Sequence, residues 1–182
     1  MQKDAMTTRL RRCFKPLFLA ASITATILMP SCSNIDCPLD NIVGMTVTLY
    51  SSETRQPLTL TDTLTVQVSG SDTILLNRGI NLQSFMLPLR YSTDTDTLLL
   101  RFSNEKGQAA RDTLFLSHEA KPHFENIDCP AAVFHKIQNI RWTSHLLREM
   151  PLTIDSVALI NPNVNYDDTE NLRVYLRATA SE

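Results

Sequence analysis

The feature that most constrains the fold of this chain is the alternation of apolar and polar residues in short runs. In Met45–Tyr50 (M-T-V-T-L-Y) every second residue is apolar, and Leu64–Val68 (L-T-V-Q-V) alternates in the same way. A period of two predicts β-strands with one buried face. Further strands are predicted at Ile74–Asn77, Phe85–Tyr91, Leu98–Phe102, Thr113–His118, His123–Cys129, Val133–Trp142, Ile154–Ile160 and Leu172–Arg177.

Turn sequences separate these runs, among them N-R-G, S-T-D-T-D, N-E-K-G and N-P-N. The best helical candidate, Trp142–Glu149, is short and is followed closely by Pro151. The chain holds only four glycines, which argues against glycine-rich phosphate-binding loops. We therefore predict an all-β fold, an antiparallel immunoglobulin-like β-sandwich, formed by residues 43–182 as one domain.

The N-terminal segment differs in composition from the rest of the chain. Basic residues dominate Met1–Lys15, an apolar run follows in Pro16–Met29, and the small residue Ser31 precedes Cys32. This order is typical of a cleaved secretory signal. The apolar run is shorter than the about 20 residues that span a bilayer. We predict a lipoprotein signal peptide over residues 1–31, with an uncleaved single-pass anchor as the alternative.

The sequence L-M-P-S-C, which ends the leader, resembles the lipobox of bacterial lipoproteins. In that pattern a large apolar residue stands three positions before the cysteine, here Met29, and a small residue directly before it, here Ser31. The resemblance implies that Cys32 becomes the first mature residue and carries a lipid, and that residues 32–42 form a short tether. Acyl chains contribute about 0.8 kcal/mol per buried CH₂, so two or three of them hold a protein stably on a membrane.

Removal of the leader makes the chain more acidic. The full chain has 17 Lys and Arg and 19 Asp and Glu; residues 1–31 contain five of the basic residues and one acidic residue, which leaves 12 against 18. Nucleic-acid phosphates need basic patches, so no nucleic-acid partner is predicted. An acidic domain is also repelled by anionic headgroups, so the predicted membrane contact is the lipid.

The pentapeptide N-I-D-C-P occurs twice and contains Cys37 and Cys129. Cys13 would be removed with the leader and Cys32 would carry the lipid, which leaves an even pair in an oxidising compartment. Such a pair predicts a disulfide between Cys37 and Cys129. No C-x-x-C or H-x-x-x-H spacing supports a metal site or a redox-active pair. The segments that follow the two pentapeptides share no pattern, so the repeat does not indicate a duplicated unit.

A tripeptide of Asp, then Thr or Ser, then an aliphatic residue occurs five times. One interpretation is strand entry, in which the Asp and hydroxyl side chains bond the local backbone at a turn and the aliphatic residue begins the buried face. The other is modification, because the tripeptide resembles the O-glycosylation acceptor motif on exported proteins of Bacteroidota. The acceptor hydroxyls would be those of Thr63, Thr73, Thr97, Thr113 and Ser156.

The loop Asn161–Asn171 is dense in side-chain oxygens. Its calcium candidates are Asn163, Asn165, Asp167 and Asp168. However, Tyr166 and Leu172 stand where an EF-hand loop has its invariant Gly and its bidentate Glu. A polar loop between two strands is therefore the favoured interpretation, and neither a metal nor a cofactor is predicted.

No sequence motif of an enzyme is present. The chain lacks G-x-S-x-G, H-E-x-x-H and the P-loop pattern. The histidines show no ligand spacing. His118, His123 and His135 are interpreted as surface or half-buried residues, and Asp96 is interpreted as part of a solvated turn. No catalytic residue is named.

Two segments, I-D-C-P-A-A-V-F-H-K-I and I-D-S-V-A-L-I-N-P-N-V-N-Y-D-D-T-E-N, resemble a family of uncharacterised small Bacteroidota lipoproteins, a domain of unknown function. The resemblance covers most of the mature chain by layout and implies an envelope lipoprotein with a β-rich domain. We predict a non-catalytic binding or assembly module, lipid-anchored at the outer membrane, with a partner protein in the envelope. Whether it faces the periplasm or the cell surface is open. A calcium- or glycan-binding module and an unrecognised hydrolase are the alternatives.

Overall fold

The computed structural model describes residues 43–179, which form ten β-strands and no helix. The strands are β1 (Met45–Ser51), β2 (Thr63–Val68), β3 (Ile74–Gly79), β4 (Ser84–Leu87), β5 (Thr95–Ser103), β6 (Ala109–His123), β7 (Ala132–Thr143), β8 (Leu152–Leu159), β9 (Asn163–Val164) and β10 (Glu170–Ala178). The all-β prediction is confirmed. The predicted signal peptide, the predicted lipid attachment at Cys32 and the predicted tether lie outside the described residues. Within residues 43–179 there is no helix with the length and apolarity that crossing a membrane requires.

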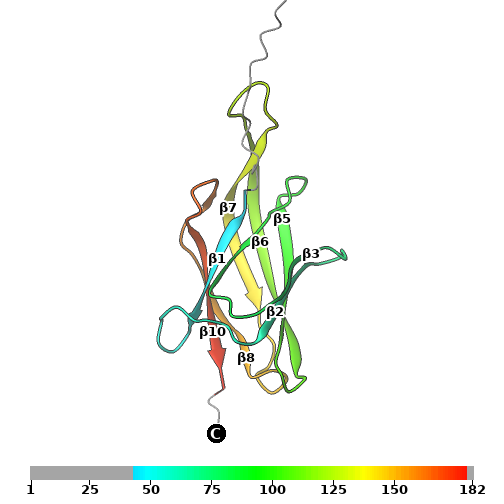
Figure 1. Ribbon diagram of the computed structural model, residues 1–182, viewed down its shortest axis with the longest axis vertical. Helices are drawn as coiled ribbons and strands as arrows, with labels where there is room; N and C mark the ends of the chain where they lie inside the picture. The colour runs from blue at the N-terminus through cyan, green and yellow to red at the C-terminus, as the bar shows by residue number, and fades with distance from the viewer. Residues whose placement is uncertain (1–42, 180–182) are drawn as a thin grey trace, which may run out of the picture. The chain divides into compact units, whose positions relative to one another are not determined.

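The strands form two sheets, as expected for a β-sandwich (Figure 1). One sheet has the order β4-β1-β10-β8, and the other has the order β3-β2-β5-β6-β7-β9. The prediction that all pairs are antiparallel is wrong at one place, because β1 lies parallel to β10, with Leu49 opposite Val174. A parallel pair needs a long crossover. In this chain the segment from β2 to β9 forms that crossover.

The core lies between the inner faces of the two sheets. In β5, Leu98, Leu100 and Phe102 are at most 1% exposed and alternate with half-buried or exposed residues. Met45 and Leu49 of β1 are fully buried in the opposite sheet. The alternation seen in the sequence is therefore the alternation between core and solvent that a two-layer sandwich imposes.

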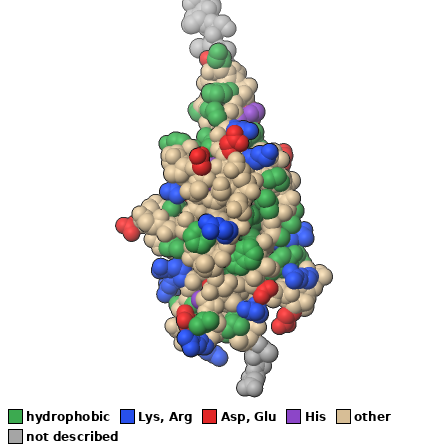
Figure 2. Space-filling view, turned by 180° about the vertical axis from the view of Figure 1, so that it is seen from behind, with side chains coloured by type: hydrophobic (Ala, Val, Ile, Leu, Met, Phe, Trp, Pro, Cys, Tyr) green, Lys and Arg blue, Asp and Glu red, His purple; other side chains and the backbone are tan. Residues whose placement is uncertain are grey.

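β6 and β7 form a long hairpin whose tip projects beyond the two sheets (Figure 1). Figure 2 shows hydrophobic side chains on this projection and charged side chains around its base. The strand predicted at His123–Cys129 is wrong: β6 ends at His123, and a turn leads into β7. The turn contains a hydrogen bond from the amide of Cys129 to the carbonyl of Asn126, 3.2 Å long. Asn126, Asp128 and Pro130 are turn-forming residues, which explains the outcome.

The short helix considered at Trp142–Glu149 is also absent. Trp142 is part of β7, where its half-buried ring packs against the core. The rest of the segment is irregular and ends in a turn in which the amide of Glu149 donates to the carbonyl of Leu146. Pro151, which follows closely, cannot donate the amide hydrogen bond that would continue a helix.

Candidate functional site

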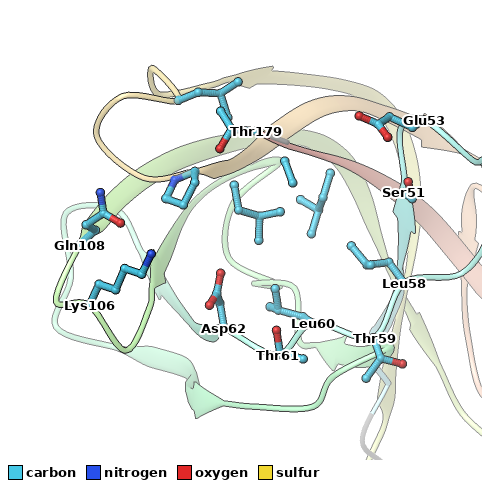
Figure 3. A pocket seen from close by; sticks show the side chains of 15 residues that line it. Ser51, Glu53, Leu58, Thr59, Leu60, Thr61, Asp62, Lys106, Gln108 and Thr179 are labelled. Carbon is cyan, nitrogen blue, oxygen red and sulfur yellow. The ribbon is translucent and has the colours of Figure 1, made fainter. Parts of the chain in front are cut away.

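A cleft of about 800 Å³ opens at the end of the sandwich opposite the β6–β7 hairpin (Figure 3). Four segments that are far apart in sequence line it: the β1–β2 connection, the β5–β6 turn, the β7–β8 connection and the end of β10. Its floor is apolar, because Leu60, Leu152 and Leu176 are core residues that each expose 8% or less of their surface. An apolar floor with a few polar groups around it is the usual composition of a binding site.

Charged side chains stand at the rim of the cleft. Glu53, Asp62 and Lys106 come from two different connections, and Figure 3 shows Asp62 and the Lys106 ammonium directed toward the cavity. Burial in the cleft raises the pKa of Asp62, and the nearby charge of Glu105 raises it further. Among the described lining residues there is no histidine or cysteine. The described lining thus combines an apolar floor with hydroxyl, amide and charged groups.

Asp112 lies at the cleft end of β6 and connects the two sheets. Its carboxylate is fully buried and accepts hydrogen bonds from the backbone amide of His145 at 2.6 Å and the backbone amide of Ile154 at 2.7 Å. The hydroxyl of Thr153 donates to it at 3.0 Å. Thr153 and Ile154 belong to β8 of the other sheet. This one carboxylate therefore holds β8 and the β7–β8 connection onto β6.

Both ring nitrogens of His145 are used in the same network. Nδ1 lies 2.6 Å from the Asp112 carboxylate, and Nε2 donates to the carbonyl of Met150 at 3.2 Å. Both ring nitrogens therefore face oxygen atoms of neighbouring groups, and the ring is held against the buried carboxylate. The pair is a structural element of the fold.

A second buried network stands at the hairpin end of the sandwich. Asp96 accepts hydrogen bonds from the backbone amide and side chain of Arg90, and from Nε2 of His118 at 2.9 Å. Nδ1 of His118 lies 3.2 Å from Nδ1 of His135. Asp96, His118 and His135 are each at most 5% exposed. The network joins the β4–β5 connection to β5, β6 and β7.

The protonation of this network follows from the burial of His135. Burial, the larger cause, and the neighbouring His118 together lower the pKa of His135 from the usual 6.5 to about 4, against a smaller opposite effect of Asp96. His135 is therefore neutral at neutral pH, and its Nδ1 shares one hydrogen with Nδ1 of His118. The interpretation as surface or half-buried residues is wrong for His118 and His135, as is the interpretation of Asp96 as solvated.

The residues of the glycosylation motif do not share one environment. Thr73 is exposed in the β2–β3 connection, and its hydroxyl is 2.8 Å from that of Ser71. The other four acceptors, Thr63, Thr97, Thr113 and Ser156, are half-buried strand residues. In two copies the Asp of the tripeptide is buried, at Asp96 and Asp112. Modification remains a prediction, and Thr73 is the most accessible acceptor.

The candidate calcium ligands are hydrogen-bonded to one another and to the backbone. The Asn165 side chain donates to the carboxylate of Asp167 at 2.7 Å and accepts from the Asp167 amide at 3.0 Å. The amide of Asn163 donates to the side chain of Asn161, while Asp168 has a positive φ of 49°. Among the described residues no group of three or more His, Cys, Asp or Glu side chains could hold a metal ion. These contacts are those of a polar loop.

Cys129 lies in the turn at the tip of the hairpin, is partly exposed and is not a free thiol. Its predicted partner, Cys37, lies outside the described residues, so the pairing remains a prediction. We expect proteolysis of the exported protein without reductant to release one peptide pair that contains Cys37 and Cys129, and reductant to separate it. Recovery of Cys129 as a single alkylated peptide before reduction would contradict the pairing.

Fold and site together define a class: an all-β sandwich domain with a cleft at one end and buried Asp–His networks between its strands. Residues 63–176 match the model of a family of unknown function (DUF6452). Because the match covers more than half of the chain, the protein belongs to this family. No curated protein and no solved structure matches the chain.

Proposed function

We propose that this protein is a lipid-anchored envelope lipoprotein of Bacteroidota that acts as a non-catalytic binding or assembly module. The cleft is the site at which it binds a partner protein, and the domain is an immunoglobulin-like sandwich. The observation that carries the proposal is the cleft itself, with its apolar floor, its charged rim and no histidine or cysteine among its described lining residues. The lipobox at Cys32 supports the anchor, and the outer membrane is the proposed location.

The charges at the rim favour an extended polar segment of the partner as the bound element. Figure 3 shows Lys106 and Asp62 on one side of the cleft and Glu53 on the other, so the rim offers both signs of charge to a bound chain. The leucines of the floor would bury an apolar side chain of that segment. Apolar anchors in a pocket within a polar rim are the usual arrangement of protein interfaces.

The alternatives have less support. An unrecognised hydrolase would need a base with a free lone pair in a cavity, whereas His145 and His118 are committed to buried carboxylates. A calcium-binding module would need uncommitted oxygens, whereas Asn165 and Asp167 are paired with each other. No contact in the described residues favours a glycan.

The test is site-specific photo-crosslinking in the native envelope. A photo-reactive amino acid at Lys106, on the cleft rim, is expected to capture one protein in stoichiometric amount. The matched control is the same amino acid at Arg101, an exposed β5 residue that does not line the cleft. Equal capture from both positions, or no protein captured from Lys106, would rule out the cleft as a partner site. Cys32→Ser is expected to release the protein from the membrane fraction, and retention there would contradict the anchor.

A further inference from the structure

The tip of the β6–β7 hairpin exposes two large apolar side chains. Ile127 is 93% exposed, more than any other large hydrophobic residue that the structure describes, and Phe124 is 65% exposed. Isolated exposed apolar residues are common on soluble proteins. These two differ because both lie in the β6–β7 connection, at the end of a hairpin that projects beyond the two sheets (Figure 1).

The projection is held by packing and is not a loose loop. The β6–β7 ladder continues up to the pair His123–Ala132. The ring of His123 stacks on that of Phe134 with centroids 4.3 Å apart, and Phe134 meets Tyr166 edge-on at 5.1 Å. The tip is therefore presented in a fixed position on an aromatic support.

The described chain begins at the same end of the sandwich as the hairpin. The amide of Thr46, near the start of β1, donates to the side chain of Asn171, which in turn donates to the carbonyl of Asn163. Asn163 pairs with Lys136 in β7, close to the base of the hairpin. Val43, the first described residue, is thus near that base.

The predicted tether is long enough to bring the lipid level with the tip. Val43 lies eleven residue steps after Cys32, and an extended chain of this length spans about 36–40 Å. The nine residue steps from Lys136 back to Ile127 span at most about 30 Å. The predicted disulfide to Cys129 would hold the anchor closer still.

Charged side chains lie behind the apolar tip. Lys121 and Glu119 form an ion pair at 3.4 Å with both side chains at least half exposed, and Lys136 is exposed on the neighbouring strand. Figure 2 shows this order of hydrophobic side chains followed by charged ones. An apolar end with a charged band behind it suits the boundary between acyl chains and headgroups. Glu125 and Asp128 next to the tip keep the insertion shallow.

We propose that Phe124 and Ile127 insert into the bilayer that holds the lipid on Cys32, so that the hairpin fixes the orientation of the domain. This inference rests on the proposed lipid anchor. Its consequence concerns the cleft: β6 has 15 residues, so the β5–β6 turn stands about 50 Å from the hairpin end of that strand. The cleft therefore faces away from the membrane, where a partner can reach it.

The test compares two tryptophan variants of the full lipidated protein, reconstituted in phosphatidylcholine vesicles whose acyl chains carry bromine. Ile127→Trp places the probe at the tip. Ile80→Trp is the matched control, because Ile80 is 58% exposed and follows Gly79, which pairs with Leu64 at the cleft end. Native Trp142 gives both variants the same background. We expect bromine to quench the tip probe at least about twofold more than the control probe.

Each outcome decides a different point. Equal quenching of the two variants, in protein whose Cys32 is shown by mass spectrometry to carry lipid, overturns the hairpin contact and leaves the anchor standing. An unmodified Cys32 overturns the anchor and the hairpin contact together. A photo-reactive residue at position 127 that captures a protein in the native envelope, with no lipid adduct, overturns the bilayer as the occupant of the tip.

Discussion

Replacing Asp112 by alanine is expected to lower the free energy of unfolding by about 3–5 kcal/mol. The buried carboxylate accepts from two backbone amides, the Thr153 hydroxyl and the ring of His145. Its removal leaves these donors without an acceptor in a region that water does not reach. The measurement is urea-induced unfolding of the purified protein, followed by far-UV circular dichroism.

The control for this experiment comes from the same tripeptide. Asp72 also precedes a threonine and an aliphatic residue, but it is exposed, so Asp72→Ala is expected to change the free energy of unfolding by less than about 0.5 kcal/mol. Should Asp112→Ala fail to fold, Thr153→Val removes a single donor and is expected to cost about 1 kcal/mol. Equal stability of the Asp112 and Asp72 variants would show that the network does not hold the sheets together.

The strands could be predicted because burial of one face imposes an alternation of apolar and polar residues on the sequence. In β2 and β5 each inward position must be apolar and each outward one need not be, so the positions of Leu64, Val66, Leu98 and Leu100 define the strands. This alternation does not say which strands are neighbours in a sheet. The alternation of apolar and polar residues in β1 fits a parallel neighbour as well as an antiparallel one. Only the tertiary arrangement places β10 beside β1.

The residues of the buried networks were harder to recognise in the sequence than the strands. In the alternation of β5, Asp96 falls on the same face as Leu98 and Leu100, and in β6 Asp112 falls on the same face as Leu114. Both acids could therefore have been assigned to the inner face from the sequence. Their donors could not have been found in this way. His118 is 22 residues from Asp96, and only the pairing of β5 with β6 brings the two side chains together.

The cleft is the least predictable feature. Its lining comes from Ser51–Asp62, the β5–β6 turn, the β7–β8 connection and the end of β10, and none of these segments carries a motif. Connections leave no periodic pattern, because their side chains are not constrained to alternate between core and solvent. Asp62 and Lys106 can be recognised as lining one cleft only once the fold brings the β1–β2 connection and the β5–β6 turn to the same end of the sandwich.

The stability of the domain is expected to fall as the pH is lowered from about 6.5 to about 4, in part through His135. The pKa of this histidine is lowered to about 4 in the folded protein, whereas the unfolded chain takes up the proton near pH 6.5. The contribution of His135 is fully present above pH 6.5 and is lost as the unfolded state binds the proton first. The loss at the acidic end of this range is at most about 3 kcal/mol.

The contribution of His135 can be separated from those of Asp96, His118 and other titrating groups by comparing slopes. His135→Gln removes the titrating ring, so the free energy of unfolding of this variant is expected to fall less steeply between about pH 6.5 and about pH 4 than that of the wild-type protein. The slope is informative even if the substitution lowers stability at every pH. His123→Gln is the matched control, because His123 is exposed on the hairpin and stacks on Phe134. The control should keep the wild-type slope, and a wild-type slope in His135→Gln would mean that His135 is not held neutral by the fold.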